Sequence, residues 1–258
     1  MVVHQNFSPE IFSLGPLTLR WYGLLYVSGL LIAYLLSERR LLATGLLKKG
    51  DEGKPLNAIL IGVVLGARLG YCLFYNFSYY AVHPIEMLFI WKGGLSFHGG
   101  LLGVMLALWF LGGRTSEGLY RWGDVFARYT PIGLGLGRLG NFMNSELVGR
   151  PTSGAWGMIF DRVDQLPRHP SQLYEACLEG LVLFLILQWV GRRTQKTGVL
   201  FWIFIGSYGS FRFLLEFLRE PDAQLGFVLG PLSLGQLLSL PMIAAAFIAA
   251  FFRFKRTV

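Results

Sequence analysis

The amino-acid sequence predicts an all-α fold: a polytopic bundle of seven transmembrane helices with a small external loop domain. Of its 258 residues 53% are hydrophobic and 15% are charged, whereas soluble domains carry about 25% charged residues. The apolar residues form long runs, and Lys and Arg gather between the runs. Because backbone groups in lipid must hydrogen-bond internally, the runs are predicted to be helices. The alternating strands of about 10 residues that build a membrane barrel are absent.

Seven segments come close to the roughly 20 apolar residues that a helix needs to span a bilayer. We expect one integral membrane domain over residues 1–258, with residues 144–172 inserted as an external region or small head. In chain order the segments are Leu17–Leu36, Ala58–Phe77, Leu95–Leu111, Val125–Met143, Leu173–Val190, Val199–Leu218 and Leu234–Phe252.

The distribution of basic residues between these segments predicts their orientation, because Lys and Arg are enriched in cytoplasmic loops. One side carries Arg39, Arg40, Lys48, Lys49, Lys54, Arg114, Arg121, Arg192, Arg193, Lys196, Arg253, Lys255 and Arg256. The other side carries only Arg20, Lys92, Arg150, Arg162, Arg168 and Arg219. The N-terminus is therefore expected outside and the C-terminus in the cytoplasm, and the fourth segment ends at the outer face.

The net charge of +8 would suggest nucleic acid in a soluble protein. Membrane topology explains the basic residues better, so we expect no nucleic-acid partner. The two cysteines, Cys72 and Cys177, have no metal-type spacing and are interpreted as small buried hydrophobes. We expect no metal site and no cofactor. The N-terminal residues lack a basic start and contain Pro9 and Glu10, so a cleavable signal peptide is not expected.

A glycine-rich stretch with charged and amide residues ends the fourth segment. Gly133, Gly135, Gly137 and Gly140 precede Asn141, and Arg138, Asn144, Glu146, Gly149 and Arg150 lie among or after them. An arginine inside a membrane segment costs about 3 kcal/mol on insertion scales, which marks a candidate functional site. The alternative is a glycine packing face with a snorkelling arginine. That alternative does not explain why Asn141, Asn144 and Glu146 follow at once.

Tyr208, Arg212 and Glu216 follow at intervals of four residues in the sixth segment, which places them on one helix face. Arg212 can pair with Glu216 and hydrogen-bond Tyr208. One interpretation is a self-neutralising pair that helps the helix to insert. The other is a second arginine that faces the same cavity as Arg138. Glu175 and Glu179 form a further pair of this spacing and are interpreted as charge balance for the arginines.

Two other residues keep two interpretations each. His98, flanked by glycines at the outer end of the third segment, is either structural or a proton-transfer group. Arg68 is either a structural or head-group arginine in the bundle or an interfacial anchor. For His169 we favour bracing of the external loop over catalysis.

Six sequence stretches in order resemble the prolipoprotein diacylglyceryl transferases, a family of bacterial membrane enzymes. They are Trp21-Tyr-Gly, Gly66-Ala-Arg-Leu-Gly-Tyr, Ser96-Phe-His-Gly-Gly, Gly137-Arg-Leu-Gly-Asn-Phe-Met-Asn-Ser-Glu-Leu-Val-Gly-Arg150, Arg168-His-Pro-Ser-Gln-Leu-Tyr-Glu and Tyr208-Gly-Ser-Phe-Arg-Phe-Leu-Leu-Glu-Phe. The resemblance implies seven membrane helices in the bacterial inner membrane. It also implies functional roles for the matching Tyr22, His98, Arg138, Asn141, Glu146, Gly149, Tyr208, Arg212 and Glu216.

The resemblance further implies the reaction. The diacylglyceryl group of phosphatidylglycerol would move to the thiol of a lipobox cysteine at the end of a prolipoprotein signal peptide, giving a thioether and glycerol phosphate. Arg138 and Arg212 suit the phosphate, because a guanidinium forks onto phosphate oxygens. His98 is the candidate base for the thiol, with Glu146 and Glu216 as alternatives.

Two other classes of membrane protein compete with this interpretation. A lipid transporter or flippase would also hold buried arginines, but repeat symmetry and a continuous polar path are not evident in the sequence. An intramembrane protease would need paired aspartates, Gly-x-Ser-x-Gly or His-Glu-x-x-His in the segments, and none occurs there.

Overall fold

The computed structural model describes residues 3–15, 17–74, 76–94, 96–221 and 227–254, and most of them are helical. The long helices are α1 (Trp21–Ala43), α2 (Lys54–Phe74), α4 (Phe97–Leu111), α5 (Ser116–Asn144), α7 (Leu183–Arg193), α8 (Val199–Leu215) and α9 (Leu234–Phe254). Shorter turns are α3 (Phe77–Val82), η1 (Pro84–Leu88), η2 (Ile90–Lys92), α6 (Ser171–Glu175) and the π-helical η3 (Ala176–Val182). The short strands are β1 (Val3–Gln5), β2 (Glu10–Leu14), β3 (Leu17–Arg20), β4 (Met158–Phe160), β5 (Pro167–Arg168), β6 (Phe227–Leu229) and β7 (Leu232–Ser233).

Each of the seven predicted segments contains a helix, and the chain is a membrane protein by the length and apolarity of its helices. Four stretches are long and apolar enough to cross a bilayer: Trp21–Ala43, Lys54–Leu73, Ser171–Arg193 and Leu234–Phe252. Two shorter helices, Gly99–Leu111 and Val199–Leu215, are also apolar.

Several helix ends differ from the predicted ends. Leu17–Arg20, expected in the first helix, is strand β3, which pairs antiparallel with β2. The helix begins at Trp21, whose amide donates to the carbonyl of Pro9. It continues to Ala43, so Arg39 and Arg40 lie in its last turns and not in a loop. Hydrophobicity locates only the apolar part of each helix, so the polar residues at the helix ends were not predicted to be helical.

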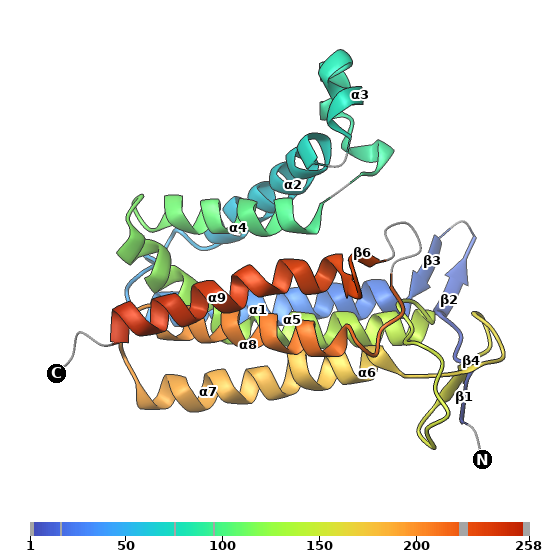
Figure 1. Cartoon of the computed structure of the whole chain (residues 1–258). Helices are drawn as coiled ribbons and strands as arrows, with labels where there is room; N and C mark the ends of the chain where they lie inside the picture. Colours follow the sequence, from blue (N-terminus) through green and yellow to red (C-terminus); the bar gives the residue numbers. More distant parts are fainter. Residues whose placement is uncertain (1–2, 16, 75, 95, 222–226, 255–258) are drawn as a thin grey trace. The chain divides into compact units, whose positions relative to one another are not determined.

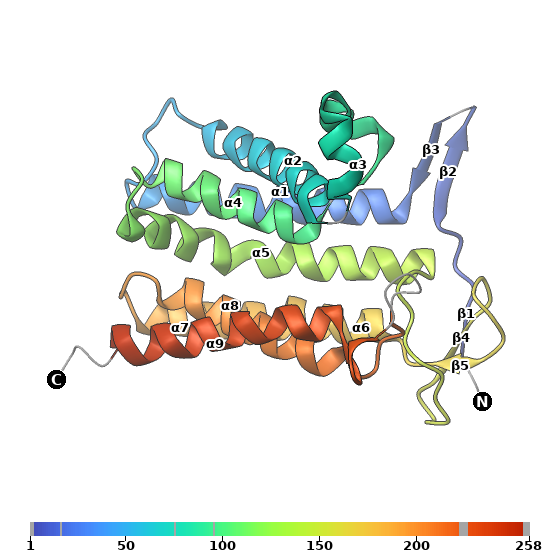
Figure 2. The same ribbon diagram turned by 45° about the horizontal axis from the view of Figure 1, so that its top comes forward.

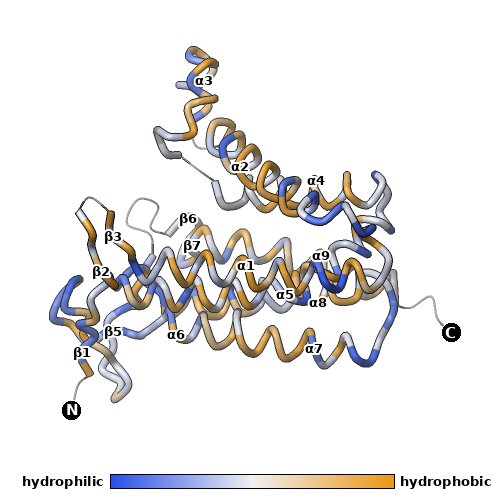
Figure 3. The backbone as a smooth tube through the Cα atoms, turned by 180° about the vertical axis from the view of Figure 1, so that it is seen from behind, coloured by the Kyte–Doolittle hydropathy of each residue, from blue (hydrophilic) through white to orange (hydrophobic). Residues whose placement is uncertain are grey.

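The chain divides into two compact units, residues 1–36 with 126–258, and residues 37–125. In the first unit α1, α5, α8, α9 and the continuous rod α6–η3–α7 run roughly parallel to one another, and α5 lies between α1 and the rod (Figures 1 and 2). Figure 3 shows α7 and α9 as hydrophobic over most of their length. Leu183, Leu187, Leu200 and Tyr208 form a buried cluster between α7 and α8.

Glycines set the close approach of the helices in this unit. A Cβ at Gly29 of α1 would lie 3.1 Å from the Cα of Gly133 on α5. On another side of α5, a Cβ at Gly180 of η3 would lie 2.7 Å from the Cα of Gly135. The glycine-rich stretch is therefore a helix-packing surface on two sides, as its simpler interpretation held.

A small head of strands lies at one end of the helices of the first unit (Figure 1). Strand β1 pairs parallel with β4, which pairs antiparallel with β5. The chain before α1 thus joins residues 158–168 in one sheet, with Gln5 opposite Phe160. Sequence analysis placed the head in residues 144–172 and did not assign the N-terminal residues to it.

In the second unit, α2 and α4 pack backbone against backbone. A Cβ at Gly66 would clash with the carbonyl oxygen of Gly99, and a Cβ at Gly62 would lie 2.5 Å from that of Gly103. Of the two cysteines, Cys72 is buried as expected, whereas Cys177 of the first unit is exposed on the protein surface.

Arg68 of α2 is a structural brace in the same unit. Its guanidinium donates to the carbonyls of Glu86, Met87 and Gly93 at 2.6–2.9 Å. It is 3% exposed and holds the turns η1 and η2 by their backbone oxygens.

Candidate active site

Arg138 of α5 reaches across the first unit to two carboxylates on the neighbouring rod. Its Nε lies 2.9 Å from Oε2 of Glu175, and its Nη2 lies 3.3 Å from Oε2 of Glu179. Both carboxylates are fully buried, and the arginine side chain is 17% exposed. Arg138 is therefore an interior, paired arginine and does not snorkel.

The two glutamates come from the junction of α6 and η3. Glu175 ends α6, and Glu179 lies within the π-helical turn that follows. A π-helical turn carries more residues than an α-helical one and often marks a functional position. Glu175 and Glu179 lie four residues apart, and both contact the guanidinium of Arg138.

Arg212, near the end of α8, contacts the same carboxylate from the other side. Its Nη1 lies 3.2 Å from Oε1 of Glu175, and its Nη2 lies 2.8 Å from Oε2 of Glu216. The structure thus brings together Arg138, Arg212 and Glu216, three of the predicted site residues, through Glu175. We call Arg138, Arg212, Arg219, Glu175, Glu179 and Glu216 the charged cluster.

The remaining arginine of the cluster lies after α8, and residues of β7 and α9 contact Glu216. Arg219 contributes a third guanidinium, 3.6 Å from Oε1 of Glu175. Ser233 donates a hydrogen bond of 2.9 Å to Oε1 of Glu216. A Cβ at Gly235 would lie 3.1 Å from that carboxylate, so a glycine lets α9 close over the Arg212–Glu216 pair.

The charged cluster balances three arginines with three glutamates, which is what a weakly solvated interior requires. The carboxylates occupy Nε and Nη2 of Arg138 and both terminal nitrogens of Arg212. Nη1 of Arg138 and Nε of Arg212 have no partner among the described contacts. Each arginine is therefore oriented by two glutamates and has one nitrogen outside these carboxylate contacts.

Asn141 and Glu146 form a second polar group at the end of α5. The Asn141 amide donates to Oε2 of Glu146 at 3.3 Å, and that of Asn144 donates to Oε1 at 3.1 Å. Asn141 follows Arg138 by three residues, so both lie on one helix face. Glu146 sits in a tight elbow just after the helix and is held by both amides.

Gly149 lies between three chain segments just beyond this elbow. Its amide donates to the carbonyl of His169, and it bridges Arg219 as an isolated β-pair. A Cβ here would lie 2.5 Å from the oxygen of His169 and 2.7 Å from that of Leu218. Glycine is thus needed for packing at this position, whatever else it does.

Arginines tie the head to the helix ends. Arg150 donates from Nε to the carbonyl of Arg219 at 2.9 Å. Arg168 donates to the carbonyl of Gly149 at 3.0 Å and contacts Glu220 at 2.7 Å. Its hydrogen bonds to Asp164 hold the pKa of that carboxyl below its usual range.

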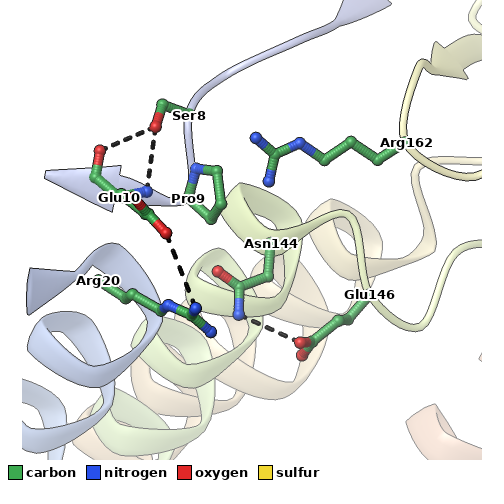
Figure 4. Close-up of a pocket in the computed structure, with 7 residues that line it drawn as sticks. All are labelled: Ser8, Pro9, Glu10, Arg20, Asn144, Glu146 and Arg162. Carbon is green, nitrogen blue, oxygen red and sulfur yellow. Dashed lines mark hydrogen bonds and ion pairs between the residues drawn. The ribbon is translucent and has the colours of Figure 1, made fainter. Parts of the chain in front are cut away.

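A polar pocket of about 540 Å³ opens beside Glu146. Figure 4 shows the side chain of Arg162 pointing toward Pro9, above Asn144, with the Glu10–Arg20 pair on the other side. The Arg20–Glu10 contact is long, at 3.7 Å, and half exposed. The lining residues are Ser8, Pro9, Glu10, Arg20, Asn144, Glu146 and Arg162.

Two predicted site tyrosines lie in helix interfaces. Tyr22 packs on Gly140, where a Cβ would lie 3.0 Å from its ring, and stacks on Tyr26. Tyr208 is 9% exposed and stacks on Phe204. The predicted hydrogen bond between Tyr208 and Arg212 is not present among the described contacts, so only the Arg212–Glu216 part of the ladder forms.

His98 belongs to the second unit. It is the second residue of α4, whose N-cap Ser96 accepts from the amide of Gly99 at 3.2 Å. Its side chain lies outside the described ones.

Sequence reasoning missed two members of this region and undervalued a third. Arg219 was counted only as a loop cation, and Ser233 was not considered. Glu175 was treated as charge balance, yet it is the residue on which all three arginines meet. Its spacing of four from Glu179 was the available signal.

Comparison with known proteins shows that nearly the whole chain matches one protein family. A family model described as prolipoprotein diacylglyceryl transferase matches residues 9–252. Similar curated proteins carry the name phosphatidylglycerol–prolipoprotein diacylglyceryl transferase. The one from Geobacter sulfurreducens is 55% identical over 238 residues, which are 92% of this chain and 92% of that protein. That from Vibrio vulnificus is 49% identical over 97% of this chain and 93% of its own. That from Oleidesulfovibrio alaskensis is 46% identical, with 99% and 96% covered.

Proposed function

The chain belongs to the prolipoprotein diacylglyceryl transferase family, and on that premise we propose how its residues carry out the transfer. It is a membrane-bound transferase whose substrates are phosphatidylglycerol and a prolipoprotein. The observation that carries the site assignment is the meeting of Arg138 and Arg212 on the carboxylate of Glu175. We assign the phosphate of phosphatidylglycerol to the open nitrogens of these two arginines.

In the proposed reaction the acceptor is the thiol of the lipobox cysteine in the signal peptide. The thiol gives its proton to a base, and the sulfur attacks the glycerol carbon that bears the phosphate ester. A carbon–sulfur bond forms as the carbon–oxygen bond breaks. The leaving oxygen keeps the electron pair, and glycerol phosphate departs. A free thiol has a pKa of about 8.5, so a base within reach is needed near neutral pH.

Arg138 and Arg212 stabilise the charge that develops on the leaving phosphate. Guanidinium donors held in advance of the reaction stabilise such charge without reorganising. The glutamates hold the guanidinium groups in place, since Glu175 contacts both arginines and Glu216 contacts Arg212.

The base is His98 in this proposal, with Glu146 and Glu216 as the alternatives. Asn141 and Gly149, together with Tyr22 and Tyr208, line the substrate site. Glu146 is held by two amide donors beside the polar pocket, which supports a place for it at the polar end of the substrates.

The proposal places the enzyme in the bacterial inner membrane as a single domain of seven helices. Residues 144–172 form the external head, the N-terminus lies outside and the C-terminus lies in the cytoplasm. The site opens toward the outer face, and the two acyl chains leave sideways between helices into the lipid. The excess of basic residues on one side supports this orientation.

A direct assay tests the reaction. Purified protein is incubated with a lipobox peptide and with phosphatidylglycerol labelled in the glycerol carbons of its diacylglyceryl group. The peptide should gain the label through a bond that resists hydroxylamine, as a thioether does and a thioester does not. A matched peptide with serine in place of cysteine should stay unlabelled. Lipid movement without labelled peptide would indicate a transporter and contradict the proposal.

A further inference from the structure

The elbow that carries Glu146 has an unusual backbone. Ser145 and Leu147, on either side of it, have φ angles of 57° and 55°. This left-handed region disfavours side chains other than glycine and persists only where neighbours hold it. Residues in such conformations cluster at functional sites.

Gln5, from strand β1, holds the first of these residues. Its side-chain oxygen accepts a 2.6 Å hydrogen bond from the hydroxyl of Ser145, and its side-chain nitrogen donates to the carbonyl of Phe142 at 2.9 Å. Gln5 is fully buried, and Ser145 is 7% exposed. The side-chain amide of Gln5 thus hydrogen-bonds both the left-handed Ser145 and the last turn of α5.

Gln5 is itself held in place by the head. It pairs with Phe160 across strands β1 and β4, and Phe160 is fully buried with its ring edge-on to Phe142 at 6.0 Å. Gln5 and Ser145 lie 140 residues apart in sequence. The far side of the elbow is held separately, by Gln172 on the carbonyl of Glu146 and Ser171 on that of Leu147.

We propose that Gln5 is a positioning residue for the transferase: through Ser145 it fixes the left-handed elbow that aims Glu146 and keeps it within reach of Asn141. The assignment rests on the proposed place of Glu146 in the site. Gln5 precedes residue 9, where the match to the family begins.

This role predicts a specific dependence on the backbone conformation of Ser145. Without Gln5, a serine at φ 57° is held only by the helix-ending backbone bonds, such as that from the Glu146 amide to the carbonyl of Asn141, and it relaxes, which turns Glu146 away. A glycine at the same position adopts this φ at no steric cost and depends less on the restraint. Replacing Ser145 by glycine should therefore compensate for the loss of Gln5, whereas replacing it by alanine should not.

The test compares Gln5→Met, Ser145→Ala, Ser145→Gly and the doubles Gln5→Met/Ser145→Ala and Gln5→Met/Ser145→Gly. Methionine keeps the length of glutamine but makes no hydrogen bond. The matched control is His4→Ala, which removes the neighbouring side chain of the same strand and its 2.9 Å contact with Asp161. Transfer to the lipobox peptide gives kcat and KM, and thermal unfolding in detergent gives stability.

We expect Gln5→Met and Ser145→Ala each to lower kcat by about 10-fold or more, with KM for phosphatidylglycerol within about twofold. The alanine double should be no slower than Gln5→Met alone, since both changes remove one hydrogen bond. The glycine double should recover to within about threefold of the wild type. His4→Ala should keep wild-type kcat.

Two results would overturn the inference: a kcat for Gln5→Met within twofold of wild type, or a glycine double as slow as Gln5→Met. An equal loss of kcat in His4→Ala would show that the strand acts only through the stability of the head. Should Gln5→Met fail to fold, the same distinction rests on Ser145→Ala against Ser145→Gly. A wild-type protein without transfer would refute the proposed function, and with it the positioning role that rests on it, whereas the variant results above bear on the positioning role alone.

Discussion

Arg138 and Glu175 form the buried pair around which the candidate site is arranged: Nε of the arginine lies 2.9 Å from Oε2 of a carboxylate with no exposed surface. Because Arg212 contacts the other oxygen of this carboxylate, Glu175 sets the distance between the two guanidinium groups. A ligand phosphate held by both arginines would share that fixed geometry.

The first prediction concerns the shape of the arginines. Arg138→Lys and Arg212→Lys keep the charge but cannot contact a carboxylate and a phosphate through separate nitrogens. Each should lower kcat/KM by about 100-fold or more. The control is Arg192→Lys at the exposed end of α7, which should leave transfer unchanged. Near wild-type activity in either site variant would show that charge alone suffices.

The second prediction separates orientation from membrane insertion at Arg212. Glu216→Gln should impair transfer, because it weakens the 2.8 Å pair that orients Arg212. Arg212→Leu with Glu216→Leu removes both charges and keeps the cluster neutral. The double variant should fold and insert yet be inactive, measured by yield in membranes and by transfer. An active double-leucine protein would remove Arg212 from the site.

The third prediction concerns His98. If it removes the thiol proton, His98→Gln should slow thioether formation by about 100-fold or more while the protein still binds phosphatidylglycerol. Between pH 6 and 9 the transfer rate of the variant should no longer show the pH dependence that the histidine gives the wild type. A variant that turns over at the wild-type rate across this range would leave Glu146 or Glu216 as the base.

The fourth prediction concerns topology. In a protein whose Cys72 and Cys177 are replaced by alanine, Ser153→Cys should react with an impermeant thiol reagent in intact spheroplasts. Gln195→Cys, between α7 and α8, should react only after the membrane is opened. The opposite labelling pattern would reverse the predicted orientation and move the site to the cytoplasmic face.

The fifth prediction is a pH dependence of the head. The pKa of Asp164 is lowered by its hydrogen bonds with Arg168, so this pair stabilises the folded state above the unfolded carboxyl pKa of about 3.9. The contribution is lost as pH falls through the folded pKa. Asp164→Asn should therefore have a lower Tm than the wild type at pH 7, and the difference in Tm should vanish as the pH is lowered. A difference in Tm that stays constant with pH would exclude this linkage.

The helices could be predicted because lipid-facing segments must be both apolar and long. Hydropathy located a helix at each of the seven segments, and spacing of four correctly paired Arg212 with Glu216. It erred at the ends: Leu17–Arg20 is apolar enough to continue a helix, yet it forms a strand because β2 supplies a partner. That partner depends on tertiary structure and not on local composition.

The charged cluster was only partly predictable for the same reason. Glu175 and Glu179 were recognised as counter-charges, but no local pattern shows that one carboxylate would be shared by arginines from three places in the chain. Gln5 was missed altogether, because a polar residue near the N-terminus resembles an exposed one until the head folds over it.

The charge balance of the cluster also has a consequence for how the protein is made. Arg138 precedes Glu179 by 41 residues, so the ribosome releases the arginine long before its partners exist. Composition qualifies four helices of the described chain to cross a membrane, and α5 is not one of them. Until α6 and η3 have been made, Arg138 lacks the two glutamates that pair with it, and an unpaired arginine in lipid costs about 3 kcal/mol on insertion scales. A chain truncated before Glu175 would leave Arg138 without either of these counter-charges.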